Sequence, residues 1–190
     1  MSGQLRETAM KRAIVEPAEL AGTALDELKQ WLAISTPKDD ALLVLLMRAS
    51  LDMCESFTGT MPLEAQCETM LPADGGWHCL GTRPVRSITT VDLVSPGGER
   101  SALPVNAYAI DIDADGSGKV RLTRSASEAR LAVRFSAGLA PDWGGLPEAL
   151  RHGIIRLAAH HYRTRDTGPA ETPPAAVAAL WRPWRRMRLI

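Results

Sequence analysis

The chain has 190 residues, enough for one good hydrophobic core with a small additional module. Hydrophobic residues make up 45% and charged residues 23%, and the formal net charge is zero, so nothing in the bulk numbers favours nucleic acid or an anionic membrane as a partner. The three cysteines form no CxxC pair, which argues against a disulfide framework and for a reducing compartment. No apolar run approaches ~20 residues, so no membrane span is expected.

The first 22 residues are small, polar and weakly periodic, and they predict a mobile N-terminal arm or an extended strap. A first helix is expected to start near Thr23, as its N-cap, and to run through Trp31. It carries one apolar stripe at helical spacing, made of Leu25, Leu28, Trp31 and Leu32.

A second helix is expected to open at Asp39 and Asp40 and to run to about Phe57, with Gly59 as its C-terminal cap. It is apolar over most of its girth, so we expect other helices or neighbouring subunits to bury it. Its main apolar stripe is predicted to be Leu42, Leu45, Leu46, Ala49, Met53 and Phe57.

Residues 63–140 change in texture and predict an antiparallel β module inserted between helices. Strands are expected near Cys67–Leu71, Trp77–Leu80, Ile88–Val94, Tyr108–Asp113, Lys119–Thr123 and Leu131–Phe135. Three segments between them have hairpin-turn composition, namely Asp74–Gly76, Pro96–Gly98 and Asp115–Gly118. Alternation of apolar residues with Arg121 and Arg134 predicts that one strand face meets a core and the other meets water.

A third helix is expected to begin with Pro147 at its first position and to end near Arg165. The proline-rich stretch 168–174 predicts a stiff linker, which a short helix-capable segment from Ala175 follows. The whole chain therefore predicts an α+β fold: a small helical bundle with an inserted antiparallel β module and an extended C-terminal tail. Its expected parts are an arm (1–22), a helical part (23–62), the β module (63–140), the helix that completes the bundle (141–167), and the linker and tail (168–190).

Candidate metal and catalytic residues do not assemble into a recognisable site. Asp111, Asp113 and Asp115 have the alternate spacing of a calcium loop, but its twelfth position is Leu122, where a bidentate acid is needed. The pairs His78-Cys79 and His160-His161 lack structural-zinc spacing. No nucleophile motif is present, and no glycine-rich turn lies at a strand-to-helix junction. We expect no catalytic, metal or cofactor site, so the chain is not predicted to be an enzyme.

The C-terminal tail has the composition of a protein interface, because Trp and Arg are the residue types that most often anchor partners. We expect partner contacts from Trp181, Arg182, Trp184, Arg185, Arg186 and Arg188. Two alternatives stay open: the tail folds back on its own core with Trp181 packed at home, or it binds a nucleic-acid backbone.

Charge is also uneven along the chain. Acids outnumber bases in residues 37–74, whereas arginines dominate residues 151–190. Oppositely charged ends suggest head-to-tail complementarity between copies or with a partner. The alternative is that both are merely solvated helix faces.

Several motifs, in this order and spacing, resemble phage head–tail connector (adaptor) proteins of long-tailed phages and gene transfer agents. The resemblance covers the helical parts, about half the chain, whereas the β region 63–140 departs from the smallest family members. The N-terminal motifs are Leu25-x-x-Leu28-Lys29-x-Trp31-Leu32-x-Ile34, Asp39-Asp40-Ala41-Leu42-Leu43-x-x-Leu46-x-x-Ala49 and Glu55-x-x-Thr58-Gly59. The C-terminal ones are Leu146-Pro147-x-x-Leu150, Ile154-x-x-Leu157-Ala158-x-His160-x-Tyr162-x-x-Arg165 and Val177-x-x-Leu180-Trp181-x-Pro183-Trp184-Arg185-x-x-Arg188.

The resemblance implies a homo-oligomeric ring, commonly a dodecamer, that docks beneath a portal protein and extends the DNA channel toward a downstream neck or tail-completion protein. It implies that the C-terminal segment contacts the portal, that DNA passes without sequence-specific binding, and that the protein resides in the neck of a particle assembled in the bacterial cytoplasm. The second and third helices would be the ring-building scaffold, with subunit packing by Leu42, Leu46, Met53, Ile154 and Leu157. The alternative function is a small DNA-binding protein, in which residues 25–49 form a helix-turn-helix-like pair.

Overall fold

The computed structural model describes residues 12–20, 22–126, 129–164 and 172–185. These residues form four α-helices and two antiparallel sheets, which confirms the predicted α+β class. They divide into two compact units, a β unit drawn from residues 1–16, 66–81 and 85–136 and a helical unit drawn from residues 17–65, 82–84 and 137–190. None of the helices described is long and apolar enough to cross a membrane.

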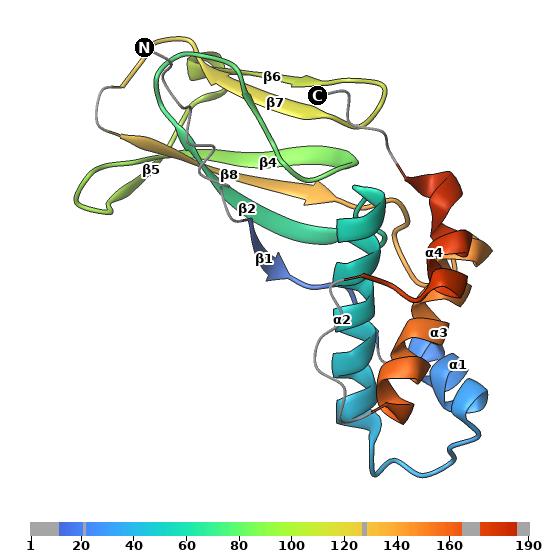
Figure 1. Cartoon of the computed structure of the whole chain (residues 1–190). Helices are drawn as coiled ribbons and strands as arrows, with labels where there is room; N and C mark the ends of the chain where they lie inside the picture. The colour runs from blue at the N-terminus through green and yellow to red at the C-terminus, as the bar shows by residue number, and fades with distance from the viewer. Residues whose placement is uncertain (1–11, 21, 127–128, 165–171, 186–190) are drawn as a thin grey trace, which may run out of the picture. The chain divides into compact units, whose positions relative to one another are not determined.

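The helical unit is built around its third helix. Its helices are α1 (Thr23–Leu32), α2 (Asp40–Thr58), α3 (Glu148–Arg163) and α4 (Ala175–Trp181), and a 3₁₀ turn, η2 (Arg182–Trp184), follows α4. α3 contacts each of the other three helices, and the chain order of this group can be followed by colour in Figure 1.

The ends of the helices follow local chemistry, with two small corrections. α2 ends as predicted at Gly59, whose φ of 72° suits a glycine and whose N–H donates 2.7 Å to the carbonyl oxygen of Glu55. α1, however, is capped by Gly22, and Thr23 is its first helical residue rather than its cap. Likewise, Pro147 caps α3 instead of occupying its first position, since its ψ of 134° is extended.

The buried face of α2 differs from the predicted stripe. The buried residues are Leu43, Met47, Ser50, Cys54 and Thr58, which are spaced three and four residues apart. Leu42, Leu45 and Ala49 of the predicted stripe are exposed. The reason lies in the two hydroxyls, because Ser50 and Thr58 donate to carbonyl oxygens one turn earlier, at Leu46 (2.8 Å) and Cys54 (2.7 Å). Since both hydroxyls are satisfied within the helix, both side chains can face the core.

The β unit contains a five-stranded and a three-stranded sheet. The larger has the order β1-β2-β8-β4-β5 and the smaller the order β3-β7-β6. The strands of the larger sheet are β1 (Ala13–Glu16), β2 (Ala65–Pro72), β4 (Val85–Val94), β5 (Arg100–Ala102) and β8 (Arg130–Ala137). The strands of the smaller sheet are β3 (His78–Cys79), β6 (Tyr108–Ile112) and β7 (Gly118–Leu122), and a 3₁₀ turn, η1 (Val105–Ala107), precedes β6.

The two sheets approach closely at Gly118 in β7, where an added Cβ would meet Val85 of β4 and Leu80. Apolar side chains fill this interior, as predicted from the alternation: Val120 and Leu122 are buried and Arg121 between them is exposed. β6 contacts β4, and Figure 1 shows the β6–β7 hairpin next to that strand.

Two of the three predicted hairpin turns are confirmed. Residues 96–98 join β4 to its antiparallel partner β5, and residues 115–118 join β6 to β7. The third, Asp74–Gly76, is not a hairpin, because it leads from β2 in one sheet to β3 in the other, where β3 pairs with β7. Glycine composition therefore identified the turn but not which strands it joins.

Two strands were not predicted from the sequence. β1 lies inside the predicted arm and pairs antiparallel with β2, with Ala13 opposite Glu68. β5 is a short exposed edge strand. Neither has the alternation of buried and exposed residues by which a strand is recognised, since every residue in both is exposed.

Two segments of the helical unit, residues 63–64 and 138–140, lie side by side. Leu63 and Ala140 form an isolated bridge, and the Glu64 N–H donates 2.8 Å to the carbonyl oxygen of Ala140. A Cβ at Gly138 would overlap the backbone of Glu64, so only glycine fits this crossing.

Candidate protein-interaction site

The segment predicted to bind a partner folds back onto the helical unit. α4 packs against α3, and the Trp181 side chain is fully buried. Its indole N–H donates a hydrogen bond of 3.3 Å to the carbonyl oxygen of Leu150, and the centroid of its ring lies 6.1 Å from that of the Phe57 ring. This corrects the prediction of Trp181 as a partner contact. A large ring whose one polar atom finds a backbone acceptor is stable inside its own chain.

A glycine in the middle of α3 makes this packing possible. A Cβ at Gly153 would overlap the Trp181 indole ring. Because glycine in a helix interior is otherwise unfavourable, its presence in α3 was the sequence signal that another group approaches the helix closely there.

The residues after Trp181 stay available to a partner. Arg182 and Arg185 are exposed, and Trp184 is half-buried against the helical core. The Arg185 guanidinium lies 5.4 Å from the centroid of the Phe57 ring, which orients it across the unit's surface. Arg186 and Arg188 lie outside the described residues.

Two of the residues predicted to pack against a neighbouring subunit are buried within their own chain. Ile154 and Leu157 are fully buried, with 0% exposure, in the core of their own unit. This corrects their assignment: α3 is enclosed by three helices of the same chain, so its apolar face is already covered. Leu46 and Met53 are half-buried against the same core.

The outer side of α2 is an unpartnered apolar surface, which we call the α2 face (Leu42, Leu45 and Ala49). Leu45 is 62% exposed and Leu42 39% exposed. Isolated exposed leucines are ordinary, but here three apolar residues share one side of one helix at three- and four-residue spacing.

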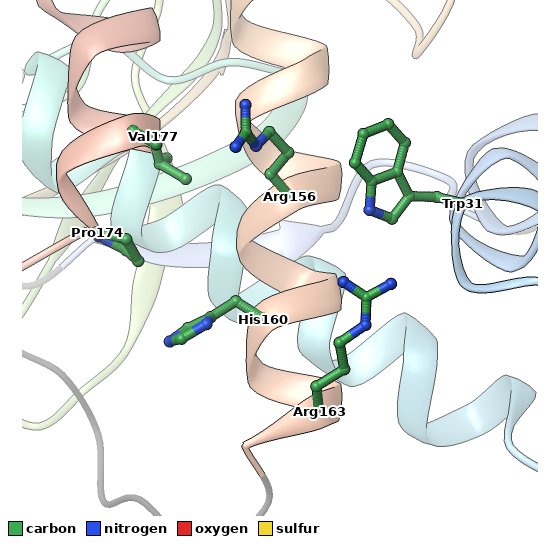
Figure 2. A pocket seen from close by; sticks show the side chains of 7 residues that line it. Trp31, Arg156, His160, Arg163, Pro174 and Val177 are labelled. Atoms are coloured by element: carbon green, nitrogen blue, oxygen red, sulfur yellow. The ribbon is translucent and has the colours of Figure 1, made fainter.

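On the other side of the unit lies a groove that the sequence did not predict, here called the α3 groove (Trp31, Arg156, His160, Arg163, Pro174, Ala176 and Val177). Figure 2 shows that Arg156, His160 and Arg163 project from one helix, α3. Trp31 enters from α1 on the right, and Pro174 and Val177 line the left. Trp31 is 44% exposed, although its ring also meets that of His152 edge-on at 5.2 Å.

The charge of the groove comes from its arginines. Along α3 the exposed residues His152, Arg156 and His160 recur every fourth position, so they form one solvent-facing row. Burial and then the nearby His160 lower the pKa of the half-buried His161, which disfavours its charged form. Guanidinium groups beside an indole and a proline suit carboxylates flanked by apolar side chains.

The candidate metal and nucleophile residues have other partners. Lys119 lies 2.8 Å from an Asp113 carboxylate oxygen and 3.8 Å from Asp111, which places a cation between two of the calcium-loop acids. His78 contacts Asp74 at 2.7 Å. Burial raises the pKa of Cys54 to about 12, so this thiol stays protonated and unreactive. Among the described residues, no three His, Cys, Asp or Glu side chains gather as a metal site would require.

Solved structures of particle necks share this fold over nearly the whole chain. A chain from the neck of an empty gene transfer agent (GTA) particle, computed with C6 symmetry, matches with a TM-score of 0.77 and 23% identity, covering 95% of this chain and 98% of that one. A chain from the neck of the native particle with C12 symmetry matches at 0.71 and 26%, covering 94% and 97%. A chain from the native GTA virion matches at 0.72 and 23%, covering 95% and 98%.

The chain has the fold of a gene-transfer-agent neck protein. This confirms the resemblance indicated by the helical motifs. It also extends it, because the shared fold covers the β unit, which those motifs left out. No family model matches the sequence, and no curated protein matches it.

Proposed function

We propose that this protein is a structural connector (adaptor) subunit that forms a ring beneath the portal of a phage-like particle, extends the DNA channel and joins the capsid vertex to the neck or tail. The observation that carries this proposal is the match to GTA neck chains over 95% of the chain. Those necks have C6 and C12 symmetry, so ring assembly is the natural use of the same fold.

The surfaces of the helical unit support a role exercised through shape. The α2 face and the α3 groove have the residue types of protein interfaces, and the candidate catalytic and metal residues are engaged elsewhere. We therefore assign the protein a structural role, with no cofactor, in the neck of a particle assembled in the bacterial cytoplasm.

Deletion of the gene from the genome that encodes the particle tests this role. We expect filled heads and separate tails to accumulate, because the ring that joins them is missing, and plasmid-borne protein to restore complete particles. Electron microscopy of the lysates measures the ratio of joined to separate structures. Complete particles in the deletion strain at the wild-type level would refute the proposal.

We further propose that the exposed end of the C-terminal segment contacts the portal, with Arg182, Trp184 and Arg185 as the described contacts and Arg186 and Arg188 beyond them. Removing all of residues 175–190 would be a poor test, because it takes the buried Val177 and Trp181 from the core. Reversing two exposed charges with Arg182→Glu/Arg185→Glu leaves that core intact.

We expect the double variant to lose at least ten-fold in portal affinity in a pull-down or by interferometry. The matched control is Arg124→Glu/Arg130→Glu, which reverses the same number of exposed charges in the β unit. Equal portal binding by both double variants would contradict the assignment of the tail.

The alternative of a small DNA-binding protein gains no support from the second helix of the proposed pair. Its outer side presents Leu42, Leu45 and Ala49, which cannot read base edges by hydrogen bonding. A gel shift that shows tight, salt-sensitive DNA binding by the isolated protein would revive that alternative.

A further inference from the structure

The helical unit has two unpartnered surfaces, and they point in opposite directions. α2 and α3 pack against each other through their buried faces, which include Leu43 and Met47 on α2 and Ile154 and Leu157 on α3. The α2 face lies on the outer side of α2, and Arg156 and Arg163 of the α3 groove lie on the outer side of α3. One surface therefore looks away from the helix pair on each side.

The two surfaces are complementary in shape and polarity. The α2 face projects leucine side chains from a convex helix, whereas the α3 groove is a hollow whose walls are Trp31, Pro174 and Val177. Leucine ends that leave water for an indole and a proline ring gain the hydrophobic free energy that both surfaces now lack.

The two surfaces also differ in charge. On the exposed side of α2 the acid Asp52 lies three residues after Ala49, with the base Arg48 beside it, whereas Asp39 accepts a hydrogen bond from Tyr162 of α3 and Asp40 pairs with Lys29 of α1. From α3 to η2 the described charges are mostly arginines, with Glu148 at the start of α3 as the exception: Arg151, Arg156, Arg163, Arg182 and Arg185. Arginines concentrated on one of the two surfaces disfavour the pairing of two grooves with each other, because like charges would then face one another.

We propose that the α2 face of one copy docks into the α3 groove of the next copy, with Leu42 and Leu45 against Trp31 and the exposed Asp52 beside Arg156 and Arg163. This inference rests on the proposed ring function and assigns the surfaces that build the ring. A ring of identical subunits needs a head-to-tail interface made of two different patches, and nearly opposite patches allow many copies to close.

The pairing is tested with two variants in which one of the two surfaces is blocked, here called the capped variants. Leu45→Arg blocks the α2 face, and Arg156→Glu/Arg163→Glu blocks the α3 groove. All three side chains are exposed, so the core of each variant remains intact. Each variant alone should fail to extend, but an equimolar mixture retains one intact α2 face and one intact groove. The mixture should therefore form one-to-one dimers and stop there.

Sedimentation velocity and native mass spectrometry, at rising concentration and with purified portal, measure the species formed. We expect wild-type protein to form higher oligomers, either free or on the portal, each capped variant to associate at least ten-fold more weakly, and the mixture to give the dimer. The controls are Ile110→Arg and Arg124→Glu/Arg130→Glu, which place the same changes on exposed positions of the β unit and should assemble like wild type.

The failures of this inference and of the proposed function are distinguishable. If wild type and both capped variants assemble equally well, the inference is wrong and the ring function stands. If wild type forms no oligomer, free or on the portal, the inference and the ring both fall. If the groove variant assembles normally but loses binding to the portal or to DNA, then the groove serves that partner and the pairing of copies is refuted.

Discussion

The helical unit and the β unit place their stabilising interactions differently. In the helical unit two large indole rings, Trp143 and Trp181, are buried, and each finds an acceptor for its N–H. Trp143 donates a hydrogen bond of 2.7 Å to a Glu27 carboxylate oxygen, and Trp181 donates one to the carbonyl oxygen of Leu150. Such side chains bury much area at one position, so a single substitution removes a large share of the packing.

In the β unit the buried side chains are mostly smaller and spread over both sheets, with Phe135 the largest among those fully enclosed. The Glu68 carboxylate of this unit lies near the surface of the larger sheet and is bound by two arginines. Arg100 donates a hydrogen bond of 2.9 Å to each carboxylate oxygen, and the Arg134 Nε donates one of 2.9 Å to one of them. Substitutions of buried side chains should therefore have the largest effects on the unfolding free energy of the helical unit. In the β unit, substitutions of charged residues should have effects that are measurable but modest.

The largest expected effect is that of Trp181→Ala. Removal of a fully buried indole leaves a cavity between α3 and α4, and we expect a loss of about 3–5 kcal/mol in unfolding free energy. Chemical denaturation measures it, and amide hydrogen exchange should locate the loss in the helical unit. The control Trp184→Ala removes a half-buried ring and should cost about 1 kcal/mol or less. Equal losses in the two variants would show that Trp181 is not a central packing residue.

Gly153→Ala should follow, with a sign opposite to the usual one. In most helices this change stabilises by up to about 1 kcal/mol. Here the new Cβ overlaps the Trp181 indole, so we expect destabilisation of about 1–3 kcal/mol. The measurement is again the denaturation midpoint. In a Trp181→Leu background, where the ring is absent, the same substitution should become neutral or stabilising; persistent destabilisation there would contradict the steric explanation.

The position of the helices could be predicted from the sequence, but the orientation of α2 could not. The caps and spacing gave its ends, since Gly59 and the first-turn acids act locally. Residues 42–47 are all apolar, so two neighbouring stripes fit a buried face equally well. The choice was made by packing against α3 and by Ser50, whose hydroxyl is satisfied by its own helix and which a polarity argument places outside.

The interaction surfaces show the same limit. The tail was recognised by composition, but its two tryptophans differ in burial because only Trp181 has Gly153 opposite it. The α3 groove combines Trp31, residues of α3 and Pro174, which are far apart in sequence. No local pattern in the sequence brings such residues together.

A smaller effect is expected from the Glu68 cluster, and it depends on pH. Hydrogen bonds from Arg100 and then Arg134 lower the pKa of Glu68 from 4.5 to about 2. A folded-state pKa below the unfolded value means that the ionised carboxylate stabilises the fold above pH 4.5, and that this stabilisation is lost as the pH falls toward 2. Because both arginines are about half exposed, solvent screening limits the contribution to about 1 kcal/mol.

The variant Glu68→Gln should therefore be less stable than wild type at pH 7, and the difference should shrink as the pH approaches 2. Denaturation across this pH range measures both curves. Glu99→Gln, at an exposed position near β5, provides the matched control and should leave the pH dependence unchanged. If the difference in unfolding free energy between wild type and Glu68→Gln stays constant from pH 7 to pH 2, the ionised Glu68 does not stabilise the β unit through these arginines.

The smallest effect concerns Trp77, an indole of the β unit that is 45% exposed, in contrast to Trp181. The Arg121 guanidinium lies 4.7 Å from the centroid of its ring, a cation–π distance. At an exposed site we expect a coupling of about 0.5 kcal/mol, so the single substitutions Arg121→Gln and Trp77→Leu should each cost little. A double-mutant cycle isolates the coupling. If the free-energy changes of the two single substitutions simply add, this pair contributes nothing to stability. If the coupling is as large as the cost of Trp181→Ala, the exposed ring stabilises its unit as much as the buried one does, and the contrast between the two units is wrong.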